Sequence, residues 1–201
     1  MPDLEIFYIG GSPCSGKSTV AEALAQHYGF SYFKADDHLE AFTARGAAEG
    51  LPVCQRIQRM SADETWMRPP LVQCQEELDY YREIFPFVLD KLAGMHAPRV
   101  IAEGAAFLPC LMTNTAHYIA ITPSREFQFS RYSQRPWVPH ILQDCSDKGA
   151  AFANWMERDA LFAEEIRSQC AQVRLPHLLT DGSVSPEDRL QQAAAVFGLH
   201  A

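Results

Sequence analysis

One short stretch near the N-terminus limits the folds open to this chain. An apolar run at residues 4–9 comes first, and a helix-forming run at residues 18–25 follows. Between them, the sequence matches the pattern G-x-x-x-x-G-K-[ST] in full at Gly11-Ser12-Pro13-Cys14-Ser15-Gly16-Lys17-Ser18. A strand, a glycine-rich loop and a helix in this order form a phosphate-binding loop. The sequence therefore predicts an α/β chain that binds a nucleotide.

The loop residues have separate expected roles. Gly11 and Gly16 permit backbone conformations and close approaches that a Cβ atom would block. The loop N–H groups and the helix N-terminus can then converge on a polyphosphate. We expect Lys17 to reach the β- and γ-phosphates of ATP and the Ser18 hydroxyl to ligate Mg²⁺. The expected nucleotide site comprises Gly11, Ser12, Pro13, Cys14, Ser15, Gly16, Lys17, Ser18 and Thr19.

Composition narrows the class of protein. A length of 201 residues predicts one domain over residues 1–201. The net charge of -8 works against binding of nucleic-acid backbone or anionic lipid, so we expect neither partner. No signal peptide or apolar stretch of about 20 residues is visible, and the six cysteines are dispersed without C-x-x-C spacing. We therefore predict a cytoplasmic protein, monomeric or homodimeric, with reduced thiols.

An acidic pair follows the second predicted strand, at residues 31–35. Asp36 and Asp37 stand where a parallel strand ends, and in an open α/β sheet this edge borders the ligand crevice. A carboxylate there can accept the proton of a substrate hydroxyl that attacks the γ-phosphate. An aspartate can also simply cap the next helix. We predict that at least one is catalytic or binds substrate, and we favour Asp36 because it leaves the strand first.

Residues 39–98 carry little strand signal. About 60 residues is more than a crossover between strands needs, and an insertion of this size can cover a substrate. Guanidinium groups match phosphate or carboxylate, so the candidates for anionic substrate groups are Arg56, Arg59 and Arg68. The pattern predicts helices at 39–48, 53–60 and 71–93, with a loop at 61–70.

The third predicted strand, residues 99–104, ends in Glu103 and Gly104. In a phosphate-loop fold, a carboxylate at this strand end orients Mg²⁺ or its water ligands. Glu103 can equally contact substrate, and the sequence does not separate the two roles. A fourth strand is predicted at residues 117–121.

The segment at residues 124–145 is expected to be a lid. Ser124 is a suitable N-cap for a helix that continues through Arg131 and Arg135, which would share one helical face. Pro136 and Pro139 then break the helix. Two arginines on a movable segment can close over ATP and stabilise charge on the transferring phosphoryl group. The alternative is a solvated basic face.

The C-terminal third completes the alternation of strands and helices. A helix is predicted at 150–173, a fifth strand at 176–180 and a last helix from Ser185 to Gly198. The turn after the fifth strand would border the adenine. The chain lacks the Asn-Lys-x-Asp motif and an Asp-x-x-Gly after the third strand, which argues against a GTPase switch.

Taken together, these features resemble the P-loop kinases that act on small molecules, including nucleoside and nucleotide monophosphate kinases, shikimate kinase and gluconate kinase. The resemblance is carried by residues 11–18, the Asp36–Asp37 pair, the Glu103–Gly104 strand end and the arginines after the fourth strand. It implies a three-layer fold with a five-stranded parallel sheet in order 2-3-1-4-5, helices on both faces and mobile lids.

The resemblance also implies phosphoryl transfer from ATP to a small metabolite. In gluconate and polynucleotide kinases, an aspartate at the position of the Asp36–Asp37 pair serves as base or substrate anchor. Nucleoside or nucleotide acceptors and sugar-acid acceptors both fit at this point. The alternative is a P-loop NTPase that acts as a nucleotide-dependent switch or regulatory module.

Overall fold

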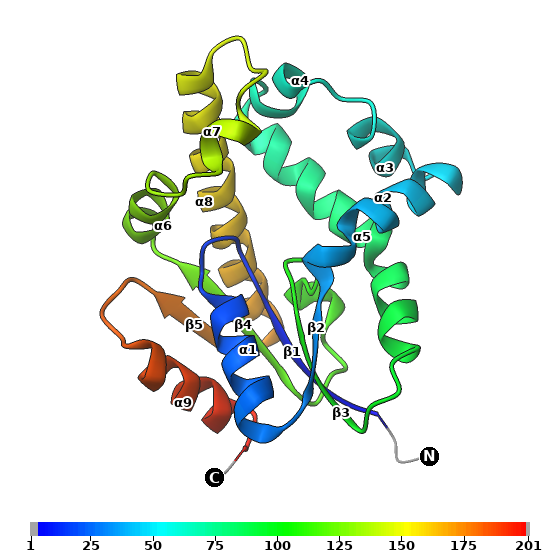
Figure 1. Cartoon of the computed structure of the whole chain (residues 1–201), viewed down its shortest axis with the longest axis vertical. Helices are drawn as coiled ribbons and strands as arrows, with labels where there is room; N and C mark the ends of the chain where they lie inside the picture. Colours follow the sequence, from blue (N-terminus) through cyan, green and yellow to red (C-terminus); the bar gives the residue numbers. More distant parts are fainter. Residues whose placement is uncertain (1–3, 200–201) are drawn as a thin grey trace.

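The computed structural model describes residues 4–199 and has a parallel sheet between two layers of helices (Figure 1). Neighbouring strands pair in parallel in the order β2-β3-β1-β4-β5, which confirms the predicted topology. The strands are β1 (Glu5–Gly11), β2 (Ser31–Lys34), β3 (Arg99–Glu103), β4 (Tyr118–Pro123) and β5 (His177–Thr180). In such a sheet, ligands bind at the carboxyl ends of the strands.

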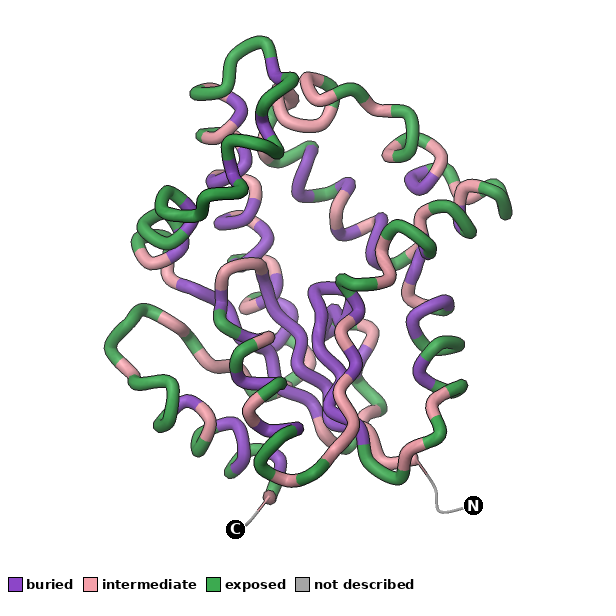
Figure 2. Tube along the Cα trace, in the orientation of Figure 1, coloured by how far each residue is buried: buried purple, intermediate pink, exposed green. Residues whose placement is uncertain are grey.

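Side chains that alternate along β1 enter two different cores. Phe7 and Ile9 pack with α1 (Lys17–Tyr28) and α9 (Pro186–Val196) on one face of the sheet. Tyr8 faces the opposite layer, formed mainly by α5 (Pro70–Ala93) and α8 (Lys148–Val173). Because strand side chains alternate between faces, a strand covered on both sides is apolar throughout. Figure 2 shows the resulting buried centre of the sheet.

The connection from β2 to β3 is helical. It consists of the short 3₁₀ helix η1 (Ala35–His38) and then α2 (Leu39–Ala48), α3 (Pro52–Ile57), α4 (Ala62–Trp66) and α5. The prediction of a loop at 61–70 is wrong, because α4 lies within it. Ser61 and Glu64 form a capping box, in which each side chain bonds the backbone N–H of the other residue. This exchange satisfies free N–H groups at the helix start and stabilises a very short helix.

The segment after β4 also differs from its prediction. The helix α6 (Arg125–Tyr132) begins at the expected cap Ser124 but ends before Arg135, so Arg131 and Arg135 do not share a helical face. Arg135 precedes Pro136, and a residue before proline is disfavoured in helical conformation. The chain instead turns at Arg135 and forms the short α7 (Val138–Ile141) before entering α8. A 3₁₀ helix, η2 (Pro109–Leu111), lies between β3 and β4.

Within residues 4–199, none of the helices combines the length and the apolar character that a membrane crossing requires.

Candidate active site

The phosphate loop joins β1 to α1 at the carboxyl edge of the sheet (Figure 1). Gly11 has φ +123°, and a Cβ atom there would lie 1.9 Å from the carbonyl oxygen of Ile121 in the neighbouring strand. A side chain at this position is therefore excluded both by backbone conformation and by space. Gly16, with φ 83°, stands directly before the first residue of α1. The local geometry accounts for both glycines of the motif.

Several polar groups of the loop have no adequate partner within the described residues. The hydroxyls of Ser12 and Ser15 are buried without a hydrogen bond. The Lys17 ammonium is also buried, and its hydrogen bond to the Ser12 carbonyl is long, at 3.4 Å. Lys17 has no ion-pair partner among residues 4–199. Unsatisfied buried donors are costly, so these groups fit a polyphosphate, which supplies acceptors.

Glu103 lies at the end of β3, directly beside the loop, and is fully buried. Its Oε1 accepts hydrogen bonds from the Ser18 hydroxyl at 2.9 Å and from the Tyr32 hydroxyl at 3.0 Å, whereas its Oε2 has no partner. Burial raises the pKa of Glu103; Lys17 opposes this shift and Asp36 reinforces it. An unpartnered carboxylate oxygen beside a hydroxyl is a suitable start for a Mg²⁺ site.

Ser18 and Glu103 cannot hold a metal ion alone. No group of three or more His, Cys, Asp or Glu side chains suited to a metal occurs among the described residues. Mg²⁺ prefers six oxygen ligands and commonly takes one or two from the protein, with the rest from phosphate and water. The two side chains therefore fit a magnesium ion that arrives with a nucleotide.

The two aspartates after β2 occupy different surroundings. The Asp37 side chain is 67% exposed, and its Oδ1 lies 3.7 Å from the Lys34 ammonium. Asp36 lies beside the end of β3: a Cβ on Gly104 would be 3.5 Å from Asp36 Oδ1 and 2.6 Å from the Ala35 Cβ. Glycine at position 104, with φ +157°, therefore lets η1 approach the end of β3 closely.

The negative charge of Asp36 contributes to raised pKa values in two parts of the protein. It raises the pKa of Glu103 at the phosphate loop, and it also raises the pKa values of Glu77 and Tyr81, which belong to α5. Electrostatic effects of this kind fall off with distance, so Asp36 is within electrostatic range of both groups. Glu77 and Tyr81 line the cavity described next, whereas Asp36 is not among its lining residues.

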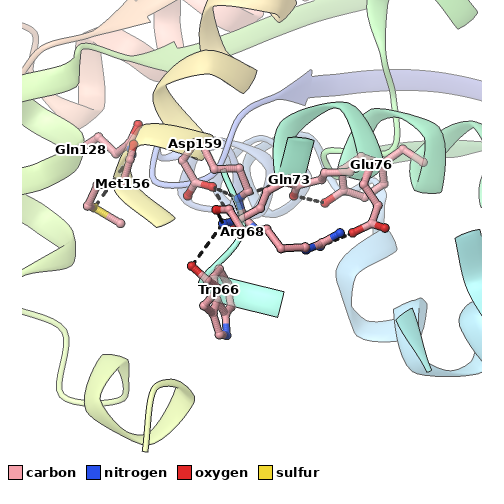
Figure 3. A network of polar contacts seen from close by, with 10 residues as sticks. Trp66, Arg68, Gln73, Glu76, Gln128, Met156 and Asp159 are labelled. Atoms are coloured by element: carbon pink, nitrogen blue, oxygen red, sulfur yellow. Dashed lines mark hydrogen bonds and ion pairs between the residues drawn. The ribbon is translucent and has the colours of Figure 1, made fainter. Parts of the chain in front are cut away.

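A cavity of about 260 Å³ opens beside α5 and α8, with walls from α2, α3 and α4. Three of its lining side chains are aromatic, those of Trp66, Tyr80 and Tyr81. Its charged lining residues are Arg68, Glu76, Glu77 and Arg158. Figure 3 shows part of this polar lining, with the Arg68 side chain reaching toward Glu76. A concave, partly aromatic pocket with a few convergent polar groups is typical of a ligand site.

Arg158 is the most enclosed cation of this cavity, with 14% of its side chain exposed. Its Nε lies 3.1 Å from Glu77 Oε2, and its Nη2 lies 2.5 Å from Oδ1 of the fully buried Asp159. Burial works to lower the pKa of Arg158, but the two carboxylates raise it overall. Burial raises the pKa of Glu77 despite the adjacent guanidinium.

Two of the three arginines predicted to bind substrate share one carboxylate. Arg56 and Arg68 both pair with Glu76, whose side chain is 8% exposed. Burial works to raise the pKa of Glu76, but hydrogen bonds from Arg68 and Arg56 lower it overall. Of the three, only Arg68 lines the cavity beside Arg158. Arg59 and Arg56 line a separate cavity of about 360 Å³ that shares Met60 with it.

The two arginines expected in the lid, Arg131 and Arg135, have different contacts near the phosphate loop. Arg135 lies over the rings of Tyr132 and Trp137, 5.2 and 5.4 Å from their centroids, and its Nη2 is 3.8 Å from the Cys14 sulfur. Arg131 instead lies 5.0 Å from the centroid of the Phe127 ring. Stacking on aromatic rings orients a guanidinium without neutralising it.

A larger cavity, of about 620 Å³, adjoins the other side of the loop. Its lining combines Ser15, Gly16 and Thr19 with Phe127, Arg131 and the turn after β5, at residues 182–185. This turn was expected to border the adenine, and it lines the same cavity as the loop residues.

Sequence reasoning missed Glu77 and Arg158 as site residues. Both were assigned to long amphipathic helices, where charged residues usually face solvent. A signal was present: Glu77 falls within the apolar stripe of α5 between Cys74 and Tyr81, which are both buried. A charge at a core position of a helix indicates a paired or functional group.

Comparisons with known proteins give a fold and no closer relationship. No protein-family model matches the sequence, and no curated protein matches it either. Similar solved structures include TT1252 from Thermus thermophilus, with 20% identity, 98% of each chain covered and a TM-score of 0.54. A shikimate kinase from Acinetobacter baumannii in complex with shikimate has 16% identity, covers 95% of this chain and 91% of its own, and gives a TM-score of 0.53.

A shikimate kinase from Bacteroides thetaiotaomicron is similar to the same degree, with 16% identity, coverage of 97% and 99%, and a TM-score of 0.52. The matches extend over almost the whole length of both chains, so the sheet and its helical layers are common to them. At these identities the likeness establishes the fold alone.

Proposed function

We propose that this chain, which has the fold of the P-loop small-molecule kinases, is a kinase that transfers the γ-phosphoryl group of ATP to a hydroxyl of a small metabolite. Such a reaction needs a phosphate cradle, a pocket for the acceptor and a group between them that takes the acceptor proton. The position of Asp36 beside the end of β3, within electrostatic range of both Glu103 and Glu77, supports the proposal.

The phosphate side of the site supplies charge and position. The backbone of residues 11–18 and the Lys17 ammonium would hold the polyphosphate, and Arg131 and Arg135 would approach it from the segment at residues 124–145. Bound Mg²⁺ would neutralise charge on the phosphate oxygens, with Ser18 and Glu103 as its protein contacts. Catalysis would then rest on placement and charge stabilisation.

The acceptor side supplies the nucleophile. An acceptor hydroxyl in the cavity would lose its proton to Asp36 as its oxygen bonds to the γ-phosphorus and the bond to ADP breaks. Helices within residues 39–98 would cover the acceptor, and residues 124–145 would act as the lid over ATP. No nucleic-acid or membrane partner is part of this proposal, and the chain would act in the cytoplasm.

The Asp36→Asn and Asp37→Asn pair tests this arrangement. A positioned general base contributes about 100-fold or more to turnover, so Asp36→Asn should lower kcat by at least about 100-fold with little change in ATP binding. Asp37→Asn is the matched control, because its side chain is largely exposed and faces Lys34. Its kcat should stay within about 3-fold of the parent.

The measurements are transfer of radiolabelled γ-phosphate to pooled small metabolites, and ATP affinity by calorimetry. Equal losses in the two variants would remove Asp36 from the role of base. If pooled metabolites gave no labelled product and only Lys17-dependent hydrolysis remained, the kinase proposal would be wrong and a nucleotide-driven regulatory module would replace it.

A further inference from the structure

The guanidinium groups in the wall of the acceptor cavity are already paired within the protein. Arg68 pairs with Glu76, and Arg158 contacts both Glu77 and Asp159. An anionic ligand is normally held by cations that lack a carboxylate partner, since only these gain charge compensation from it. Here an incoming carboxylate or phosphate ester would face Glu76 and Glu77 at the same wall.

The same wall has an acceptor atom that lacks a donor. Gln73 is 3% exposed, and its amide nitrogen donates to the carbonyls of Trp66 and Arg68 at 3.2 and 2.7 Å. Its Oε1 is buried without a hydrogen-bond partner. A buried acceptor of this kind requires a donor from elsewhere. A ligand that binds here should therefore donate hydrogen bonds.

An unsatisfied donor is present as well. The Nε of Arg68 is buried and lacks a hydrogen-bond acceptor. A hydroxyl group both donates and accepts, whereas an ionised carboxylate only accepts. Hydroxyl groups can therefore satisfy both the Gln73 oxygen and the Arg68 nitrogen, whereas a carboxylate group can satisfy only the Arg68 nitrogen.

The size and surface of the cavity restrict the ligand further. The cavity has a volume of about 260 Å³, which limits the ligand to a small molecule. Trp66, Tyr80 and Tyr81 give the cavity aromatic surface against which a ring with C–H groups can pack.

From these contacts, and on the basis of the kinase function proposed above, we infer that the phosphoryl acceptor is a small uncharged polyhydroxy compound, such as a sugar, a polyol or a ribose-bearing nucleoside. One acceptor hydroxyl forms the new bond to the γ-phosphorus as the bond to the leaving ADP oxygen breaks, and its proton passes to Asp36. The remaining hydroxyls bond Gln73 and Arg68.

Charge-sorted acceptors test the inference directly. A small-molecule cell extract is passed over an anion-exchange resin near neutral pH, and the flow-through and the bound acids are each incubated with the protein and ATP labelled in the γ-phosphate. Label that depends on Lys17, measured against Lys17→Met, should be at least about 10-fold higher in products from the flow-through. A preference for the acid fraction would overturn the inference and leave the kinase function intact, whereas no product from either fraction would overturn the kinase function itself.

A change of charge at the wall gives a second, independent test. Glu76→Gln leaves Arg56 and Arg68 without their carboxylate, so products from the acid fraction should rise by about 10-fold relative to those from the flow-through. Asp79→Asn, on the same helix but exposed and paired with Arg82, is the control and should not change this ratio. A ratio that stays unchanged in a folded Glu76→Gln protein would contradict the inference.

Discussion

The two halves of the proposed site handle positive charge in opposite ways. At the phosphate loop, Lys17, Arg131 and Arg135 have no carboxylate partner among residues 4–199. In the acceptor cavity, Arg68 and Arg158 are each paired with buried carboxylates.

This difference separates groups kept for a ligand from groups that stabilise the protein. Lys17 is buried as well as unpaired, so it costs free energy until an anion arrives and thereby favours anion binding, whereas Arg131 and Arg135 are exposed. A paired buried cation is compensated within the fold. Its removal leaves the partner carboxylates buried without a counter-charge, which destabilises the protein. The comparison predicts that substitutions in the two halves will affect stability and turnover in different proportions.

The largest effect on stability is expected at Arg158. Arg158→Met would leave Glu77 and Asp159 without their shared cation, and breaking a buried ion pair in this way costs about 3 to 5 kcal/mol. Urea unfolding measures the loss. Arg56→Met is the control, because its side chain is 54% exposed and Glu76 retains Arg68, so its cost should stay below about 1 kcal/mol. Similar losses for both variants would show that Arg158 contributes no more to stability than the exposed Arg56.

The opposite result is expected at Lys17. Lys17→Met removes a cation that has no partner in the protein, so the free energy of unfolding should change by less than about 1 kcal/mol, or rise. Phosphoryl transfer should fall by about 100- to 1000-fold, because the transition-state charge loses a direct donor. Measuring both quantities on one preparation separates the two halves of the site. A large loss of stability with unchanged turnover would reverse the comparison.

A smaller, pH-dependent effect is expected at Glu103. Its pKa is raised in the folded protein, so the unfolded chain releases this proton at a lower pH than the folded chain does. The stability that Glu103 contributes is therefore fully present below about pH 4.5 and declines as the pH rises through its raised pKa. Glu103→Gln keeps an acceptor for Ser18 and Tyr32 and lacks this decline.

The thermal midpoint of Glu103→Gln should therefore exceed that of the parent by an amount that grows with pH and then levels off. Magnesium-dependent transfer should fall in the same variant. Glu164→Gln, an exposed substitution within α8, provides the baseline. A difference in thermal midpoint that stays constant across the pH range would show that the titration of Glu103 does not affect stability.

Local patterns explain why much of the fold could be predicted. The strand, loop and helix around residues 11–18 depend on glycine conformations and an apolar run, both of which are readable in a few residues. The strand ends at Asp36 and Glu103 were also readable, because a parallel sheet brings such ends to one edge. The capping box at Ser61 and Glu64 was equally local, and overlooking it produced the wrong loop.

Other features depended on packing between distant segments. The position of Asp36 beside the end of β3 follows from the close approach of Ala35 to Gly104, which no local pattern contains. The pairing of Arg158 with Glu77 joins α8 to α5, whose residues lie far apart along the chain.

The end of α6 before Arg135, in contrast, depended on Pro136 and so could have been predicted from the sequence.

By itself, the sequence determined the strand, glycine loop and helix around residues 11–18 and the acidic groups at the edge of a parallel sheet, because glycine conformation and strand pattern act over short distances. Only the tertiary structure decided which arginines are free and which are neutralised. That outcome depends on which carboxylates the packing of α5 against α8 and α4 brings within a few ångströms of each guanidinium, and electrostatic pairing is set by distance in space.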